Sequence, residues 1–148
     1  MIVYFDTSAL VKAYVEEAGS RQVHAILDYP ANSFGSAIIT EVEMAAALQK
    51  AIRLYNAAEY SMAESWQDFL DDWSAFTHLE VSDFLVKRAS RIAFEYRLRG
   101  YDSLHLAAAR MWQEKLRSPI TLATYDRDLW LAGRQAGMQV WPEETGNQ

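Results

Sequence analysis

The sequence predicts an α/β fold in which helices cover both faces of a mostly parallel sheet. Short apolar runs that suit buried strands alternate with longer segments that have helical periodicity. The connections are short, and no repeat, low-complexity stretch or linker interrupts the 148 residues. Because parallel strands need crossover connections, this alternation favours a parallel sheet within one domain that spans residues 1–148.

Two strand–helix units are predicted in the first third of the chain. Residues 2–5 form an unbroken apolar run that ends at Asp-Thr-Ser, which favours a buried strand and then a helix over residues 7–16. A second helix starts at Ser20. A further apolar run lies within residues 32–39, and the next segment, residues 40–53, is rich in strong helix formers.

The middle of the chain predicts a helical hairpin. Between residues 55 and 76, large apolar side chains are spaced four, three, four and three positions apart, which is the pattern of one long amphipathic helix. This helix should fold back on the helix of residues 40–53. The spaced residues are Met62, Trp66, Phe69, Trp73 and Phe76.

The rest of the chain continues the alternation of strands and helices. A short strand over residues 78–81 precedes a helix that Ser82 and Asp83 cap and that Gly100 ends. Asp102 then opens an alanine-rich helix.

A final strand–helix–strand unit closes the predicted fold. Residues 119–125 are the third clear apolar run, and a helix follows over residues 126–135. Gly137 ends this helix, and residues 139–141 predict an edge strand.

The composition excludes several kinds of site. The absence of cysteine removes disulfides, thiolate zinc sites, iron–sulfur clusters and cysteine nucleophiles. Residues 1–5 are too short and lack the basic leader of a signal peptide, and no segment approaches the length of a membrane span, so we expect a cytoplasmic protein without membrane contact. The net charge of −6 argues against holding nucleic acid by bulk positive charge.

Four carboxylates are predicted to lie at one edge of the sheet. Asp6 and Asp126 each follow a strand, Asp102 begins a helix, and Glu43 lies one turn into another helix. Taken singly, each acid is better explained as a helix cap, and Thr40-x-x-Glu43 fits a capping box. Capping does not explain their convergence, however, and gathered carboxylates repel one another unless a cation joins them. Oxygen ligands favour Mg²⁺ or Mn²⁺ over zinc.

The segments around these acids carry the motifs of a known family. The first strand leads into Asp6-Thr-Ser, and Glu43 is followed by an apolar residue and then by Ala47 and Leu48. Asp102 starts the run Asp-Ser-Leu-His-Leu-Ala, and Asp126 ends the run Thr-Tyr-Asp. In this order, and over nearly the whole chain, the motifs resemble those of PIN domains of the VapC toxin type.

This resemblance implies a fold, an activity and partners. The fold would be three-layered α/β/α with a protruding helical hairpin. The activity would be a Mg²⁺- or Mn²⁺-dependent endoribonuclease that hydrolyses RNA, with the four acids as metal ligands and catalytic residues. The protein would be the toxin of a toxin–antitoxin pair, would bind a VapB-like antitoxin on the hairpin, and would form a homodimer.

Other residues near the predicted edge have more than one interpretation. The hydroxyls of Thr7, Ser8 and Thr124 would hold a carboxylate or phosphate, or would cap helices and turns. Asp128 is a second-shell or alternative ligand. The basic side chain of Arg99 would meet RNA phosphates or lie on a solvated face.

Two residues compete with or adjoin the predicted catalytic set. Glu41 offers a second carboxylate beside Glu43, but only the register of Glu43 places the small residue and leucine as the family has them. His105 lies one turn after Asp102 and would face the site as a proton donor, yet a lone histidine on an alanine-rich helix is better explained by packing. We leave His105 outside the catalytic set.

Alternatives also remain for the function and for the hairpin. A phosphoacceptor receiver domain also gathers acids and Mg²⁺, but it needs paired acids after the first strand. A catalytically silent PIN-like binding module is the other alternative. The apolar stripes of the hairpin would be buried in the core and in a homodimer contact. Alternatively, Trp66 and Trp73 would anchor a partner, since tryptophan is enriched at interfaces.

Overall fold

A computed structural model describes residues 1–55 and 59–144 and contains one parallel sheet. Every pair of neighbouring strands is parallel, and their order is β3-β2-β1-β4-β5. The strands are β1 (Ile2–Phe5), β2 (Ser33–Ala37), β3 (Thr77–Leu79), β4 (Thr121–Ala123) and β5 (Gln139–Trp141). The α/β prediction is therefore confirmed, and the sheet is parallel throughout the described residues.

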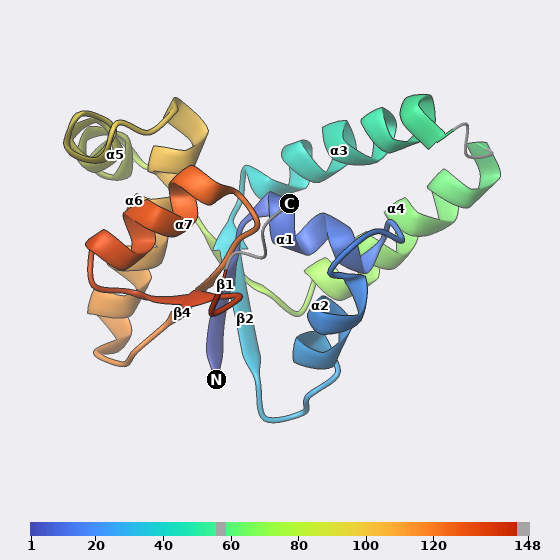
Figure 1. Ribbon diagram of the computed structural model, residues 1–148, viewed down its shortest axis with the longest axis horizontal. Coiled ribbons are helices and arrows are strands. Elements are labelled where there is room, and N and C mark those ends of the chain that lie inside the picture. Colours follow the sequence, from blue (N-terminus) through green and yellow to red (C-terminus); the bar gives the residue numbers. More distant parts are fainter. Residues whose placement is uncertain (56–58, 145–148) are drawn as a thin grey trace.

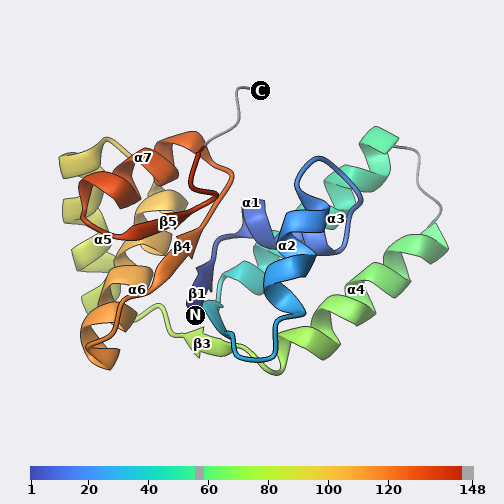
Figure 2. The same cartoon turned by 60° about the horizontal axis from the view of Figure 1, so that its bottom comes forward.

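Helices cover both faces of this sheet, as Figures 1 and 2 show. One face packs against α1 (Thr7–Leu10), the 3₁₀ turn η1 (Val11–Ala13), α2 (Ser20–Leu27), α3 (Thr40–Tyr55) and α4 (Glu59–Trp73). The other face packs against α5 (Asp83–Tyr96), α6 (Gly100–Leu116) and α7 (Arg127–Gln135). The expected three layers are present.

The alternation of β1 explains why the sheet needs helices on both sides. Val3 and Phe5 are fully buried in one core, whereas Tyr4 is fully buried in the other. Gly35 of β2 admits the ring of Trp112 from α6, because a Cβ there would lie 2.6 Å from Cη2 of that ring. The central strands are thus shielded from water on both faces.

The helices α3 and α4 form the predicted hairpin, and the C-terminal half of α3 and the N-terminal half of α4 project from the body of the molecule (Figure 1). The predicted helix over residues 55–76 is observed as α4, and its expected first turn includes residues 56–58, which lie outside the described residues. Among the described residues, no helix combines the length and apolarity that a membrane crossing requires.

The predicted helix over residues 7–16 is shorter in the structure. It consists of one α-helical turn and the 3₁₀ turn that ends at Ala13. Lys12 Nζ then contacts the Glu17 carboxylate at 3.0 Å and the Ala18 carbonyl at 2.9 Å, which holds the following loop against the turn. The chain therefore leaves the helix early to begin α2.

The predicted boundary at Gly100 is wrong. The helix α5 ends at Tyr96, its C-cap residue Arg97 adopts a left-handed conformation (φ 57°), and the Leu98 N–H bonds to the Ala93 carbonyl. Gly100 is instead the first residue of α6, so Asp102 occupies the third helical position and does not open the helix. The burial of Leu98 fixes this turn, and the position of Gly100 in the sequence does not reveal where the turn lies.

Candidate active site

The four acids singled out from the sequence all lie at the carboxyl edge of the sheet. Asp6 directly follows β1 and caps α1, and Asp126 follows β4 and caps α7. Asp102 lies in the first turn of α6, and Glu43 lies in the first turn of α3. The strand order reverses between β1 and β4, which is where open parallel sheets form a crevice for ligands.

Asp6 is held by hydroxyl groups in a nearly dry environment. Asp6 is 4% exposed, and its Oδ2 accepts hydrogen bonds from the hydroxyl of Thr124 and from Ser8 Oγ, the latter at 3.1 Å. Ser8 Oγ also accepts the backbone N–H groups of Tyr125 and Asp126, at 2.8 and 3.1 Å. Burial raises the pKa of Asp6, although nearby His105 and the hydroxyls oppose this effect.

Glu43 is held by two side chains from other elements. Its Oε1 lies 3.0 Å from Thr7 Oγ1 and 2.7 Å from Nε2 of His105. Burial raises the pKa of Glu43, but the hydrogen bond and charge of His105 outweigh it, so the pKa lies below the usual value. Burial lowers the pKa of His105, but Glu43 and Asp6 together raise it above its usual value.

Asp102 and Asp126 share one guanidinium group. Arg99 Nε lies 2.9 Å from Asp102 Oδ2, and its Nη2 lies 2.9 Å from Asp126 Oδ2. Burial raises the pKa of Asp102; Arg99 lowers it, and the neighbouring charge of Asp126 raises it further. The Arg99 side chain itself is 75% exposed.

The four carboxylates share an edge but do not converge on one point. Among the described residues, no three histidine, aspartate or glutamate side chains are close enough to hold a metal ion as they stand. Hydroxyls engage Asp6, an imidazole engages Glu43, and a guanidinium engages the other two. The predicted convergence is therefore only partial, because each carboxylate is paired with a group of this chain.

The chemistry of this set nevertheless fits a hard divalent ion. It contains four carboxylates and no sulfur, and such oxygen ligands suit Mg²⁺ or Mn²⁺. Ser8, Thr7 and Thr124 hold these carboxylates, which agrees with one of the two interpretations of their hydroxyls. Asp128, by contrast, is exposed and makes no side-chain hydrogen bond among the described residues.

His105 is the residue near the site that sequence reasoning set aside. It is 2% exposed, lies on the face of α6 that carries Asp102, and contacts Glu43 directly. The three-residue spacing from Asp102 was the available signal, since residues three apart share a helix face. Its contact with Glu43 joins residues 62 positions apart and depends on the tertiary fold.

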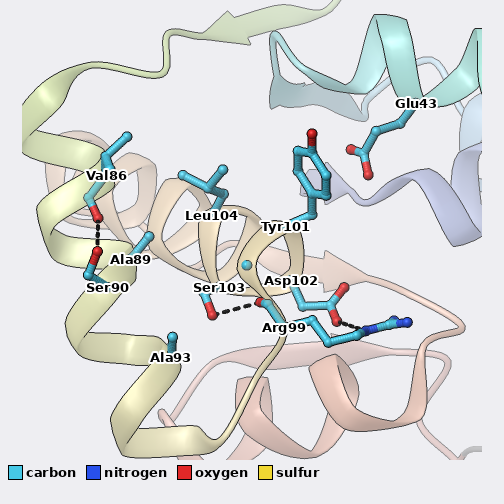
Figure 3. A pocket seen from close by; sticks show the side chains of 11 residues that line it. Glu43, Val86, Ala89, Ser90, Ala93, Arg99, Tyr101, Asp102, Ser103 and Leu104 are labelled. Atoms are coloured by element: carbon cyan, nitrogen blue, oxygen red, sulfur yellow. Dashed lines mark hydrogen bonds and ion pairs between the residues drawn. The ribbon is translucent and has the colours of Figure 1, made fainter.

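A pocket of about 690 Å³ opens beside these acids, between α5 and the start of α6 (Figure 3). Glu43, Arg99 and Asp102 line its polar side, and Figure 3 shows Tyr101 between Glu43 and Leu104. Val86, Ala89, Ala93 and Leu104 make the other wall apolar. The edge therefore offers a hollow large enough for part of an extended ligand next to the carboxylates.

The sequence pattern that defines the PIN domain matches residues 3–133. This chain belongs to the PIN-domain family. The match contains all four acids as well as His105 and Arg99.

Curated relatives of this PIN domain are named ribonucleases. The chain is 32% identical over 143 residues to "Ribonuclease VapC45" and to "Ribonuclease VapC49", both from Mycobacterium tuberculosis. Each alignment covers 97% of this chain and 96% of the relative. The similarity thus extends over nearly the full length of both proteins.

Solved structures share the fold of this PIN domain at lower sequence identity. PAE2754 from Pyrobaculum aerophilum has a TM-score of 0.65 and 21% identity, with 95% of this chain and 83% of that chain covered. VapBC-5 from Mycobacterium tuberculosis, a member of the VapBC family of toxin–antitoxin systems, has a TM-score of 0.58 and 15% identity, with 94% and 96% covered. These likenesses confirm the predicted fold.

Proposed function

We propose that this PIN domain is a metal-dependent endoribonuclease that acts as the toxin of a toxin–antitoxin pair. The observation that carries the proposal is its 32% identity to two VapC ribonucleases over 97% of the chain. The four carboxylates at the carboxyl edge support it, because metal-dependent hydrolysis of a phosphodiester needs such oxygen ligands. The receiver-domain alternative is set aside by membership of the PIN family.

Asp6, Glu43, Asp102 and Asp126 would hold one or two Mg²⁺ or Mn²⁺ ions. When bound, the metal polarises the scissile phosphate and lowers the pKa of the attacking water. Ser8 and Thr124 donate hydrogen bonds to Asp6 and so fix the orientation of its carboxylate. A carboxylate of the set accepts the proton of the water, and cleavage leaves a 5′-phosphate and a free 3′-hydroxyl.

The surrounding residues suit a polyanionic substrate despite the net charge of −6. Arg99 is exposed at the site, and its guanidinium can turn from the acids to an RNA phosphate. The pocket beside Tyr101 and Asp102 can receive the nucleotide next to the cut bond, with the aromatic ring as a stacking surface. As a ribonuclease toxin, the protein would act in the cytoplasm, where its RNA substrates are.

The proposed partners are a VapB-like antitoxin and a second copy of the chain. Two solved structures that share the fold are described in these terms, a toxin–antitoxin complex from Klebsiella pneumoniae and VapBC-5, a member of the VapBC family of toxin–antitoxin systems. Exposed Phe84 and Phe94 on α5 offer an apolar surface for a homodimer contact.

The proposal is tested by RNA cleavage with the purified protein freed of its partner. Cleavage should require Mg²⁺ or Mn²⁺ and should stop in EDTA. Asp6→Asn and Asp102→Asn should each remove activity in a folded protein, whereas Asp28→Asn, which changes an exposed carboxylate at the end of α2, should not. A rate that is unchanged by EDTA would contradict the metal mechanism, and an inactive wild type with metal present would favour the silent binding module.

A further inference from the structure

A buried chain of hydrogen bonds runs from the sheet to Glu43. The Ala37 N–H of β2 donates to the hydroxyl of Tyr4 at 3.1 Å, and that hydroxyl lies 2.8 Å from Nδ1 of His105. The other ring nitrogen of His105, Nε2, lies 2.7 Å from Oε1 of Glu43. Tyr4 is fully buried and His105 is 2% exposed, so water does not compete for these bonds.

The donor and the acceptor of each hydrogen bond in this series follow from the hydrogens that each group carries. The Tyr4 oxygen already accepts from Ala37, so its own hydrogen is available to Nδ1 of His105, which leaves the ring hydrogen on Nε2. An ionised carboxylate can only accept, so Nε2–H donates to Glu43. If the imidazole gains a second proton, Nε2 still carries a hydrogen and the bond to Glu43 is unchanged.

Both hydrogen bonds to Glu43 go to the same oxygen. Thr7 Oγ1 and His105 Nε2 each bind Oε1, whereas Oε2 has no hydrogen-bond partner among the described residues. The two donors come from α1 and α6, on opposite faces of the sheet. They therefore fix the plane of the carboxylate and leave its second oxygen available, and Figure 3 shows the carboxylate pointing toward the side on which Asp102 and Tyr101 lie.

We propose that His105, backed by Tyr4, is a positioning residue that orients Glu43 so that its free oxygen is presented to the metal ion. This role rests on the proposed function, since it assumes that Glu43 is a ligand. The partners that hydrogen-bond a metal ligand are worth about tenfold to a hundredfold in metal affinity. His105 itself does not touch the metal or the RNA.

The test measures Mn²⁺ affinity by calorimetry, with cleavage as a second readout. His105→Leu keeps a buried side chain but removes the donor, and it should weaken Mn²⁺ binding about tenfold or more. His105→Gln places an amide N–H near the position of Nε2, and it should restore affinity to within about threefold of wild type. Tyr4→Phe should weaken binding by a smaller factor, because Nδ1 loses its hydrogen-bond partner and the tautomer with hydrogen on Nε2 is then favoured by Glu43 alone.

Leu106→Val is the matched control, because Leu106 is a fully buried neighbour of His105 on α6 that belongs to the core under α5, α6 and α7 and makes no hydrogen bond to Glu43. It should lower the free energy of unfolding without changing Mn²⁺ affinity. If His105→Leu does not fold, the pair His105→Gln and Tyr4→Phe decides the question.

The possible failures are distinguishable. A wild type that binds no Mn²⁺ contradicts the metal site itself, and the role of His105 fails with it. If the wild type binds Mn²⁺ and folded His105→Leu binds it equally well, the positioning role alone is overturned. If His105→Leu does not fold, wild-type affinity in Tyr4→Phe overturns it. Equal weakening in the leucine and glutamine variants also overturns it, because a donated hydrogen bond would then not be the cause.

Discussion

Arg99 Nη2 lies 2.9 Å from Oδ2 of Asp126, a residue 27 positions away in the sequence. The same guanidinium also binds Asp102, so one exposed cation joins the start of α6 to the start of α7. It supplies positive charge where two carboxylates would otherwise repel each other. A divalent ion bound by these acids would compete with Arg99 for the same oxygens.

Arg99→Gln should therefore separate metal binding from RNA binding. Loss of the guanidinium removes a competitor and a neighbouring positive charge, so Mn²⁺ affinity should rise by a few-fold. Cleavage should nevertheless fall, chiefly through a higher KM for RNA, because a phosphate contact is lost. Calorimetry and steady-state kinetics measure the two effects, and weaker Mn²⁺ binding in the variant would show that Arg99 does not compete with the metal.

Asp6→Asn should stabilise the metal-free protein at neutral pH. Because burial raises the pKa of Asp6 above its usual 3.8, the folded state holds that proton more tightly than the unfolded state does. This proton stabilises the folded state at low pH, and that stability is lost as pH rises from 3.8 through the folded pKa. The loss is about 1.4 kcal/mol for each pH unit that separates the unfolded and folded pKa values. Asparagine remains neutral and can still cap α1.

Urea unfolding in EDTA at a series of pH values measures this difference between wild type and Asp6→Asn. The variant should gain relative stability as pH rises and then level off. Addition of Mn²⁺ should reverse the order, because the metal stabilises only the protein that binds it. A variant that is less stable than wild type at neutral pH in EDTA would mean that the charge of Asp6 is fully compensated by its hydroxyl partners.

Glu43→Gln should abolish cleavage, whereas Glu41→Gln should leave most of it. Glu43 is held at the site by His105 and Thr7, but Glu41 is exposed and accepts the indole N–H of Trp73 at 3.2 Å. A glutamine carbonyl can still accept that bond, so Glu41→Gln is a matched control on the same helix. Cleavage rates of the two variants, measured with Mn²⁺ on one RNA, test this prediction. If Glu41→Gln lost activity and Glu43→Gln kept it, Glu41 would be the metal ligand.

The hairpin offers a smaller partner surface than its apolar stripes indicate. Trp73 is 4% exposed and stacks on His78, with ring centroids 4.2 Å apart, so the expectation that it anchors a partner is wrong. Phe69 and Phe76 of the α4 stripe are also buried, as are Met44 and Leu48 on α3. Trp66 remains partly exposed and lines a shallow groove of about 350 Å³ with Ile38, Val42 and Ala45.

Antitoxin binding should therefore depend on this groove. Trp66→Ala and Val42→Asp should each reduce co-purification with the antitoxin, whereas Phe94→Ala, which changes an exposed side chain on α5, should not. Trp73→Ala is unsuitable as a test, because removing a buried tryptophan costs about 3–5 kcal/mol of stability. Retention of the antitoxin at wild-type affinity by both groove variants, or its loss in Phe94→Ala, would move the docking site to another surface.

Local patterns were sufficient to predict the order of the elements and the places of the acids. The apolar runs before Asp6 and before Asp126 predict buried parallel strands. Both acids therefore lie where such strands end. The same reasoning failed at Gly100, because the turn between α5 and α6 depends on the burial of Leu98 and on the left-handed conformation of Arg97. Turn geometry of this kind is set by packing.

The sequence by itself thus determined the fold class, the family motifs and the edge at which the four carboxylates lie, since periodicity and strand ends are local properties. Only the tertiary structure decided how each carboxylate is paired. The contacts of Glu43 with His105, of Asp6 with Thr124 and of Asp126 with Arg99 join residues 62, 118 and 27 positions apart. Such pairings depend on side-chain orientation across packed elements, and no spacing along the chain encodes that orientation.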